Sequence, residues 1–134
     1  MERLIRALIS ILISTLGNLL WILTGGILIA LWYALGGVVL CLTVVGIPFG
    51  VQLFKLAVLA LFPFGNEVRI TGFASGPLGV AMNVLWLLIG GIWLAACHLA
   101  LALIMALTIV GLPFARQHFK LARLALMPFG SVIT

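Results

Sequence analysis

The sequence predicts an all-α integral membrane protein in which one helical unit occurs twice. Of the 134 residues, 66% are hydrophobic and only 7% are charged, whereas soluble domains carry ~25% charged residues. A soluble chain of this size leaves about a third of its unfolded surface in water, so this composition fits lipid. Two long apolar runs, each followed by a Gly-x-Pro break, mark the two units.

An internal duplication accounts for most of the chain. An offset of 65 residues aligns 18–65 with 83–130 without a gap, and 25 of the 48 aligned positions are identical. Self-similarity at one fixed offset is typical of repeat architectures. We therefore expect a single membrane domain at 1–134, with repeat one at 16–65, a polar connector at 66–79 and repeat two at 80–130.

Each unit opens with an apolar run that is long enough to cross a bilayer once. The runs, 18–45 and 83–110, would rise ~42 Å as helices, against a hydrocarbon core of ~30 Å. One tilted transmembrane helix fits each run, and a helix broken at its glycine pair also fits. A full hairpin with two crossings per unit is disfavoured, because it needs about 40 residues before the break.

The Gly-x-Pro-Phe break predicts a second, shorter helix in each unit. The segments 49–61 and 114–126 would be ~20 Å long, too short to span, so an interfacial or re-entrant helix is expected. Their basic residues form a polar face opposite Phe119, as in helices that lie at lipid headgroups. The residues of the helix break are Gly46, Pro48, Gly111 and Pro113. The candidate contacts to anionic lipid are Lys55, Arg116, Lys120 and Arg123.

Two segments lie outside these helices. The connector 66–79 is polar and is expected in water, with a short extended piece at 68–71. Residues 2–15 form either an interfacial helix or an extension of the first span. One face of that helix carries Arg3, Arg6, Ser10 and Ser14.

Charge favours a cytoplasmic location for both termini of this multi-pass chain. With one crossing per unit, five basic residues lie at the two ends and only Lys55 and Arg69 lie between them. An odd number of crossings per unit makes the two copies an inverted repeat. The alternative, parallel repeats with two crossings each, would carry Arg116, Lys120 and Arg123 through lipid at about 2.5 to 3.5 kcal/mol each.

Three polar residues inside the apolar runs are candidates for function. His98 lies deep in a span at the position aligned with Tyr33, where it would either handle protons or bond a neighbouring helix as a neutral imidazole. Asn18 and Asn83 begin the runs, where structural hydrogen bonding is favoured over pore lining. Small residues expected at close helix contacts are Gly25, Gly26, Ala30, Gly90, Gly91 and Ala95.

The polar inventory excludes most enzyme chemistry. Glu2 and Glu67 are the two acidic residues, so no carboxylate pair or carboxylate-rich metal site is available. Cys41 and Cys97 lie within apolar runs and do not indicate a disulfide. We expect no enzyme, no cofactor and no metal. The net charge of +5 indicates anionic membrane lipids as partners in place of nucleic acid.

Three short motifs are each used twice. They are the Asn-x-x-Trp start at Trp21 and Trp86, the Gly-(Ile/Leu)-Pro-Phe break, and the Phe-Lys-Leu-Ala…Leu-x-Pro-Phe-Gly close. Across about 16–130, this pattern resembles the YccF family of small bacterial inner-membrane proteins. The resemblance implies the bacterial cytoplasmic membrane and a duplicated inner-membrane-component domain, and it brings no settled activity. The two tryptophans are expected in an interfacial belt.

A single copy of this size cannot surround a water-filled channel with helices. We therefore expect a homo-oligomer, with pore formation between copies as the leading hypothesis. The alternative is a non-conducting accessory or lipid-interacting subunit that docks to another protein.

Overall fold

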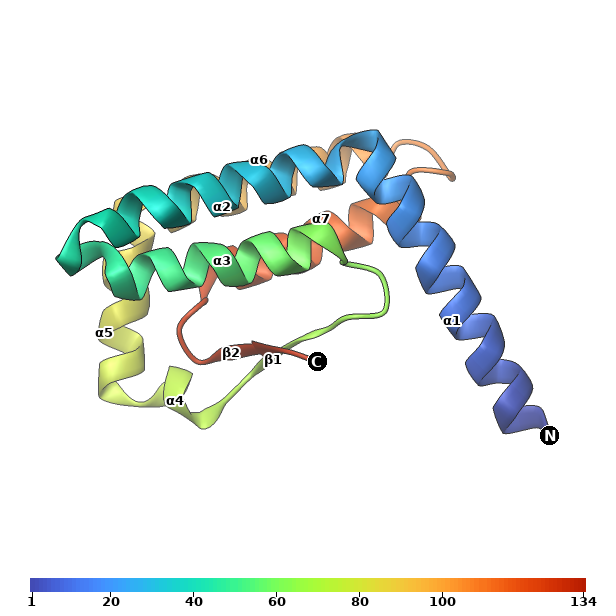
Figure 1. The fold of residues 1–134 in the computed structure, drawn as a ribbon, viewed down its shortest axis with the longest axis horizontal. Helices are drawn as coiled ribbons and strands as arrows, with labels where there is room; N and C mark the ends of the chain where they lie inside the picture. Colours follow the sequence, from blue (N-terminus) through green and yellow to red (C-terminus); the bar gives the residue numbers. More distant parts are fainter.

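Repeat one folds as a kinked helix and a shorter helix that returns beside it (Figure 1). Helix α1 (Glu2–Trp21) passes through a turn of π-helix (Ile22–Gly26) into α2 (Ile27–Leu42). A 3₁₀ turn (Val44–Gly46) then reverses the chain into α3 (Ile47–Leu61). The computed structural model describes residues 1–134. The segment ahead of the first apolar run is thus an extension of the long helix.

Repeat two has the same plan with a shorter leg. Helix α5 (Pro77–Trp86) passes through a second π-helical turn (Leu87–Gly91) into α6 (Ile92–Met105), and α7 (Leu112–Leu126) returns. In Figure 1, α2 and α6 lie across the top, and α1 and α5 descend at opposite ends.

A small sheet joins the connector to the C-terminal tail. Strands β1 (Val68–Ile70) and β2 (Ser131–Ile133) pair antiparallel, with Val68 opposite Ile133. The expected extended piece at 68–71 therefore exists as a strand. A short helix, α4 (Gly72–Ser75), leads from this sheet into repeat two.

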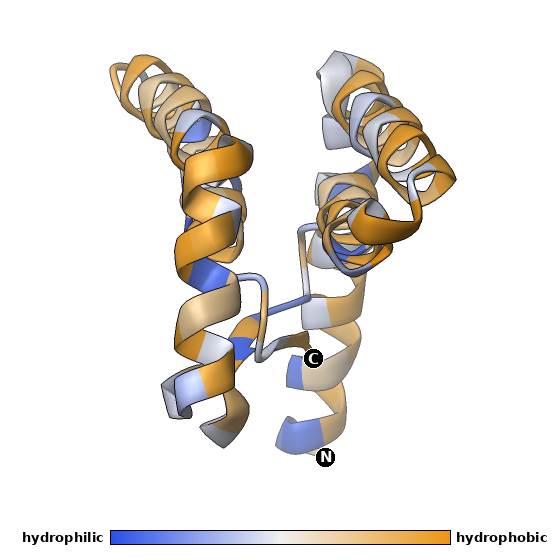
Figure 2. Cartoon of the chain, turned by 90° about the vertical axis from the view of Figure 1, so that its left-hand side faces the viewer, coloured by the Kyte–Doolittle hydropathy of each residue, from blue (hydrophilic) through white to orange (hydrophobic).

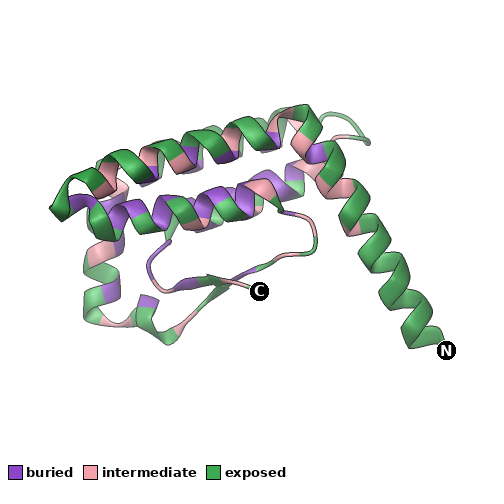
Figure 3. Ribbon diagram, in the orientation of Figure 1, coloured by how far each residue is buried: buried purple, intermediate pink, exposed green.

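The outer surface is apolar over most of its area. Three helical segments are long and apolar enough to cross a membrane: Glu2–Leu42, Val44–Leu61 and Pro77–Met105. Figure 2 shows hydrophobic residues over both helical arms and hydrophilic ones toward the N-terminus and the sheet. The side chains of α1 are exposed along most of the helix (Figure 3), so lipid or another protein must cover them.

Glycine permits both the kink and the reversal in repeat one. Gly25 has φ of 132°, which is a backbone conformation that other residues rarely adopt. At the reversal, a Cβ on Gly46 would lie 2.3 Å from the carbonyl oxygen of Leu40. Gly111 is equally crowded, because its Cβ would lie 2.0 Å from the carbonyl oxygen of Met105. Pro48 and Pro113 follow in the first turns of α3 and α7, where a missing amide hydrogen costs little.

Contacts between the repeats occur in equivalent pairs. Trp21 stacks on Phe114 with ring centroids 6.2 Å apart, and Phe49 stacks on Trp86 with centroids 6.5 Å apart. The second contact is the first with the repeats exchanged, because the two tryptophans are equivalent and so are the two phenylalanines. Two units related by a two-fold axis make contacts in such pairs, with residue i of one unit against residue j of the other and the reverse. The equivalent residues Tyr33 and His98 hydrogen-bond each other, and the equivalent residues Val68 and Ile133 pair in the sheet. The pseudo-two-fold axis therefore passes through both pairs.

The connector and the C-terminal tail lie side by side, which contradicts an inverted repeat. Beyond the paired strands, Glu67 and Thr134 exchange two backbone hydrogen bonds of 2.9 Å. Two hydrogen-bonded segments cannot face opposite sides of a ~30 Å hydrocarbon core. The prediction of an inverted repeat is therefore wrong: each repeat starts and ends on the side of the sheet, and the repeats are parallel about the axis (Figure 1).

The physical reason is a helical hairpin that the residue count disfavoured. The apolar run alone is too short for two crossings, but the hairpin also uses the helix after the Gly-x-Pro break, so α2 pairs with α3 and α6 pairs with α7. The returning helix packs along its partner and brings the chain back toward the side on which the repeat began (Figure 1).

This topology predicts a simple labelling pattern. In a chain with Cys41 and Cys97 replaced by alanine, Ser75→Cys and Thr134→Cys are expected to react with a membrane-impermeant thiol reagent from the same side. Both positions are exposed and adjoin the sheet. Val45→Cys, at an exposed apolar hairpin tip, serves as the control that stays protected by lipid in intact vesicles. Labelling of positions 75 and 134 from opposite sides would refute the parallel arrangement.

Candidate functional site

An asparagine at the start of each apolar run holds the turn that closes the same repeat. Asn18 Nδ2 donates to the carbonyl of Phe64 at 2.9 Å, and the Phe64 amide donates to Asn18 Oδ1 at 2.8 Å. Asn83 makes the same pair with Phe129, both at 3.0 Å. One side-chain amide thus satisfies both backbone polar groups of the turn. These asparagines are structural hydrogen-bonding groups within their own repeats.

Each repeat buries a tryptophan at its kink. Trp21 and Trp86 are each 2% exposed, and Nε1 of Trp21 donates to the carbonyl of Ala60 at 2.6 Å, as its counterpart does in repeat two. A Cβ on Gly26 would lie 2.1 Å from the Trp21 ring, and one on Gly91 would lie 2.2 Å from the Trp86 ring. The expectation of an interfacial belt is therefore wrong for these two residues, because the glycines admit the indoles into the core.

Two equivalent lysines tie each returning helix to the other repeat. Lys55 and Lys120 are half-buried, and each ammonium group donates to two backbone carbonyls across the axis. Burial lowers the pKa of Lys120, while Glu67 opposes that shift. The lysines therefore bridge the repeats. The acceptors are Pro128 (2.5 Å) and Ser131 (2.8 Å) for Lys55, and Pro63 and Asn66 (2.7 Å) for Lys120.

Three buried polar side chains meet near the axis. Tyr33 Oη is hydrogen-bonded to His98 Nε2, and His98 Nδ1 lies 2.9 Å from His118 Nδ1. His118 comes from α7, where the equivalent residue of repeat one is Leu53. The ring of Trp21 lies 4.8 Å from that of His118, measured between centroids. This trio is the main polar feature that breaks the symmetry of the core.

The geometry of the trio limits how its protons can be arranged. Two facing ring nitrogens need one donor and one acceptor, so one consistent pattern has Tyr33 donating to His98 and His98 donating to His118. Burial lowers the pKa of His118, on α7, to about 4, which keeps this imidazole neutral at pH 7. No group of three His, Cys, Asp or Glu side chains is placed to hold a metal. The trio can order hydrogen bonds between the repeats.

A pair of equivalent glutamines carries unsatisfied acceptors. Gln52 Nε2 donates to the carbonyl of Pro48 at 3.4 Å, and Gln117 Nε2 donates to that of Pro113 at 3.1 Å. The Oε1 atom of each glutamine is buried and has no partner in the protein. Buried acceptors of this kind normally find a donor, so these two atoms are exceptions within an otherwise satisfied core.

Comparison with known proteins agrees with the doubled architecture. The family model YccF, described as an inner membrane component domain, matches residues 16–66 and again residues 81–131. The chain belongs to the YccF family. It is similar to inner membrane protein YccF of Escherichia coli strain K12, with 28% identity over 87% of this chain and 84% of that protein. The protein of the same name from Shigella flexneri gives the same values. No solved structure matches the chain.

In this YccF-family chain, the basic residues of α7 lie along one stripe of the helix but differ in their surroundings. Arg116 and Arg123 are exposed, and their guanidinium groups bond nothing within the chain. Phe119 lies on the same exposed side, since residues three and four apart are neighbours on a helix. The expectation that Phe119 lies on an apolar face opposite the basic residues is therefore wrong. Lys120 instead turns toward the other repeat, because carbonyls there supply its hydrogen bonds.

The predicted small residues have two roles in the YccF fold. One glycine of each pair lies in the kink, and the other accepts the tryptophan ring. The buried alanines lie between the two helices of each hairpin. The kink residues are Gly25 and Gly90, the tryptophan contacts are Gly26 and Gly91, and the hairpin alanines are Ala30 and Ala95.

Sequence reasoning missed His118 and the role of Tyr33. Only His98 was expected within a span, since His118 follows the Gly-x-Pro break in the segment expected at the headgroups. For the contact of Tyr33 with His98, the available signal was the duplication itself. Two equivalent units that pack about a two-fold axis bring equivalent positions together on that axis, as Tyr33 and His98 do.

Proposed function

We propose that the chain forms a homo-oligomeric assembly in the inner membrane and that any water-filled path runs between copies. The observation that carries this proposal is α1, whose polar stripe of Arg3, Arg6 and Ser10 is exposed along an otherwise apolar helix. Arg3 and Arg6 in the first turns can reach lipid headgroups, whereas a polar residue deeper in the helix, such as Ser10, faces a helix bundle or a water-filled cavity. A second copy of α1 would supply such a surface.

The packing between the repeats supports a path outside the single chain. Four leucines on the returning helices are fully buried, and together with the aromatic pairs they fill the contact region. This core occupies the contact between the returning helices, and the hollow that both repeats line beside Thr24, Met105 and His118 has a volume of only about 260 Å³. The four are Leu56, Leu59, Leu121 and Leu124.

We further propose that the side carrying the sheet and both termini is cytoplasmic. Arg3, Arg6 and Arg69 belong to that side, in keeping with the positive-inside tendency. The hairpin tips at Val45 and Val110 are exposed and apolar, which fits re-entrant hairpins that end in lipid.

Removing the polar stripe tests the oligomer. In lipid nanodiscs, native mass spectrometry of the parent chain is expected to show several copies. Arg6→Leu combined with Ser10→Leu should weaken association about ten-fold, or ~1.4 kcal/mol, because the stripe loses its polar contacts. Liposome flux should fall in parallel.

Leu12→Ala is the matched control, because residue 12 lies on the opposite face of α1. It should leave the number of copies unchanged. A parent chain that is monomeric in native lipid would overturn the proposal. Oligomers that pass no ion or small solute would favour a non-conducting lipid-interacting subunit, the second candidate, which two surface grooves support.

A further inference from the structure

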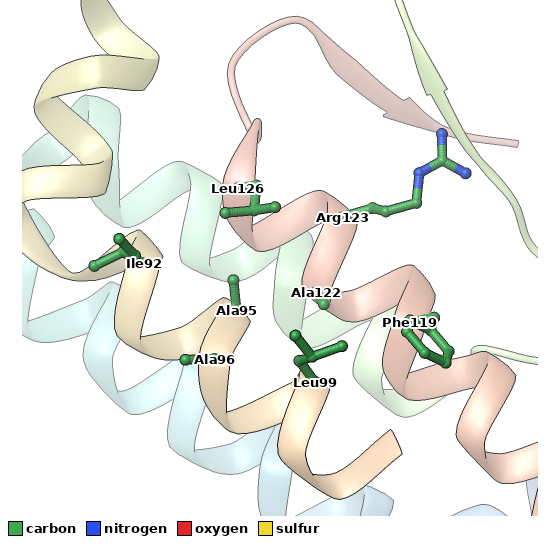
Figure 4. Close-up of a pocket in the computed structure, with 8 residues that line it drawn as sticks. All are labelled: Ile92, Ala95, Ala96, Leu99, Phe119, Ala122, Arg123 and Leu126. Atoms are coloured by element: carbon green, nitrogen blue, oxygen red, sulfur yellow. The ribbon is translucent and has the colours of Figure 1, made fainter. Parts of the chain in front are cut away.

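Each hairpin carries an apolar groove lined by its own two helices. The groove between α2 and α3 has a volume of about 400 Å³, and the groove between α6 and α7 has about 350 Å³ (Figure 4). All eight lining positions correspond one to one at the 65-residue offset. Alanines such as Ala95 and Ala122 line the space between the helices (Figure 4), and their small side chains leave it open.

The two grooves differ in charge at a single position. Val58 lines the first groove, and Arg123 takes the equivalent place in the second. In Figure 4, the aliphatic part of Arg123 lies beside the groove and the guanidinium extends toward the strands. Arg123 also lines a smaller hollow with Val68 and Ile70 of the sheet region. The free cation thus lies between the apolar groove and the polar side of the molecule.

We propose that the α6–α7 groove binds an anionic phospholipid, with an acyl chain along the alanines and the phosphate at Arg123. Arginine recognises phosphate oxygens through paired N–H donors, and no acidic group of the chain occupies its guanidinium. The groove supplies the apolar surface that an acyl chain needs. Both halves of the lipid are therefore matched by adjacent parts of one site.

Charge favours a lipid over a second copy of the chain as the occupant. A second copy would have to neutralise Arg123 with Glu2 or Glu67, the two acidic residues available. The bilayer provides anionic headgroups beside every copy, and the chain carries a net charge of +5. The α2–α3 groove, without a cation, holds acyl chains of any headgroup.

The duplication provides its own exchange experiment. The full chain is placed in nanodiscs of phosphatidylethanolamine with a minority of phosphatidylglycerol. Native mass spectrometry then counts the lipid molecules that stay bound to the protein after it is released from the nanodisc. Arg123→Val, which gives the second groove the residue of the first, should lower retention of phosphatidylglycerol relative to phosphatidylethanolamine about five-fold. Val58→Arg should add a second site selective for phosphatidylglycerol.

Two further variants separate this site from diffuse attraction. Arg116→Val removes an equally exposed cation of α7 that lies outside the groove, and should leave the retained lipid unchanged. Ala122→Leu places a larger side chain in the groove at a position where both repeats carry alanine, and should reduce retention of both lipids. Equal losses for Arg116→Val and Arg123→Val would overturn the proposal in favour of diffuse surface charge. Unchanged retention in Arg123→Val would also overturn it.

Discussion

Replacing Trp86 by alanine is expected to lower the free energy of unfolding by about 3 to 5 kcal/mol. The indole is 2% exposed, donates to the carbonyl of Ala125 at 2.6 Å and stacks on Phe49 of the other repeat. Its loss would leave a cavity and an unpaired carbonyl where the kink, the returning helix and the other repeat meet. Equilibrium unfolding in mixed micelles, followed by far-ultraviolet circular dichroism, measures the change.

Trp93 provides the matched control, because it is 73% exposed on α6. Trp93→Ala is expected to change the free energy of unfolding by no more than about 0.5 kcal/mol. Gly91→Ala should displace the same indole from the core, since the new Cβ would lie 2.2 Å from Trp86 Nε1. Equal losses for Trp86→Ala and Trp93→Ala would show that the buried indole contributes nothing specific.

The thermal stability of the folded chain is expected to fall as the pH is lowered from about 6.5 to about 4. Burial lowers the pKa of His118 from its ordinary value of 6.5 to about 4. Between those values the unfolded chain binds the proton more readily than the folded chain, so acid favours unfolding. Above pH 6.5 both states are neutral at this residue and its contribution is constant. Melting temperatures across the interval measure the effect.

His118→Leu installs the residue that repeat one has at position 53, and should reduce this pH dependence. Tyr33→Phe removes the hydroxyl bonded to His98 without removing a group that titrates in the interval. It should therefore lower stability by a similar amount at each pH and preserve the slope. A slope that His118→Leu leaves unchanged would be evidence against the assignment.

Local and compositional features of the fold could be predicted from the sequence. The apolar runs, the 65-residue offset and the glycines at 46 and 111 each reflect short-range constraints, and the short strand at 68–70 follows from local composition. Membrane class and family follow from the same features. Such features need no knowledge of which distant segments meet.

The direction of the returning helices required long-range information. Lys120 was assigned to headgroups because a cation in lipid is costly, yet carbonyls of the other repeat satisfy it. Trp21 near the start of a run fits an interface as well as a core, and Gly26 five residues later was the only local indication of burial. His118 has no counterpart in repeat one, so the duplication concealed its role.

The reciprocal packing makes this chain a dimer whose two subunits share one polypeptide. A dimer of identical units would place the same side chain twice on its axis, two tyrosines or two histidines. Covalent fusion removes that restriction, so a tyrosine can face a histidine and an arginine can occur in one half where the other keeps valine. Each half can then specialise by substitution while its partner preserves the shared frame.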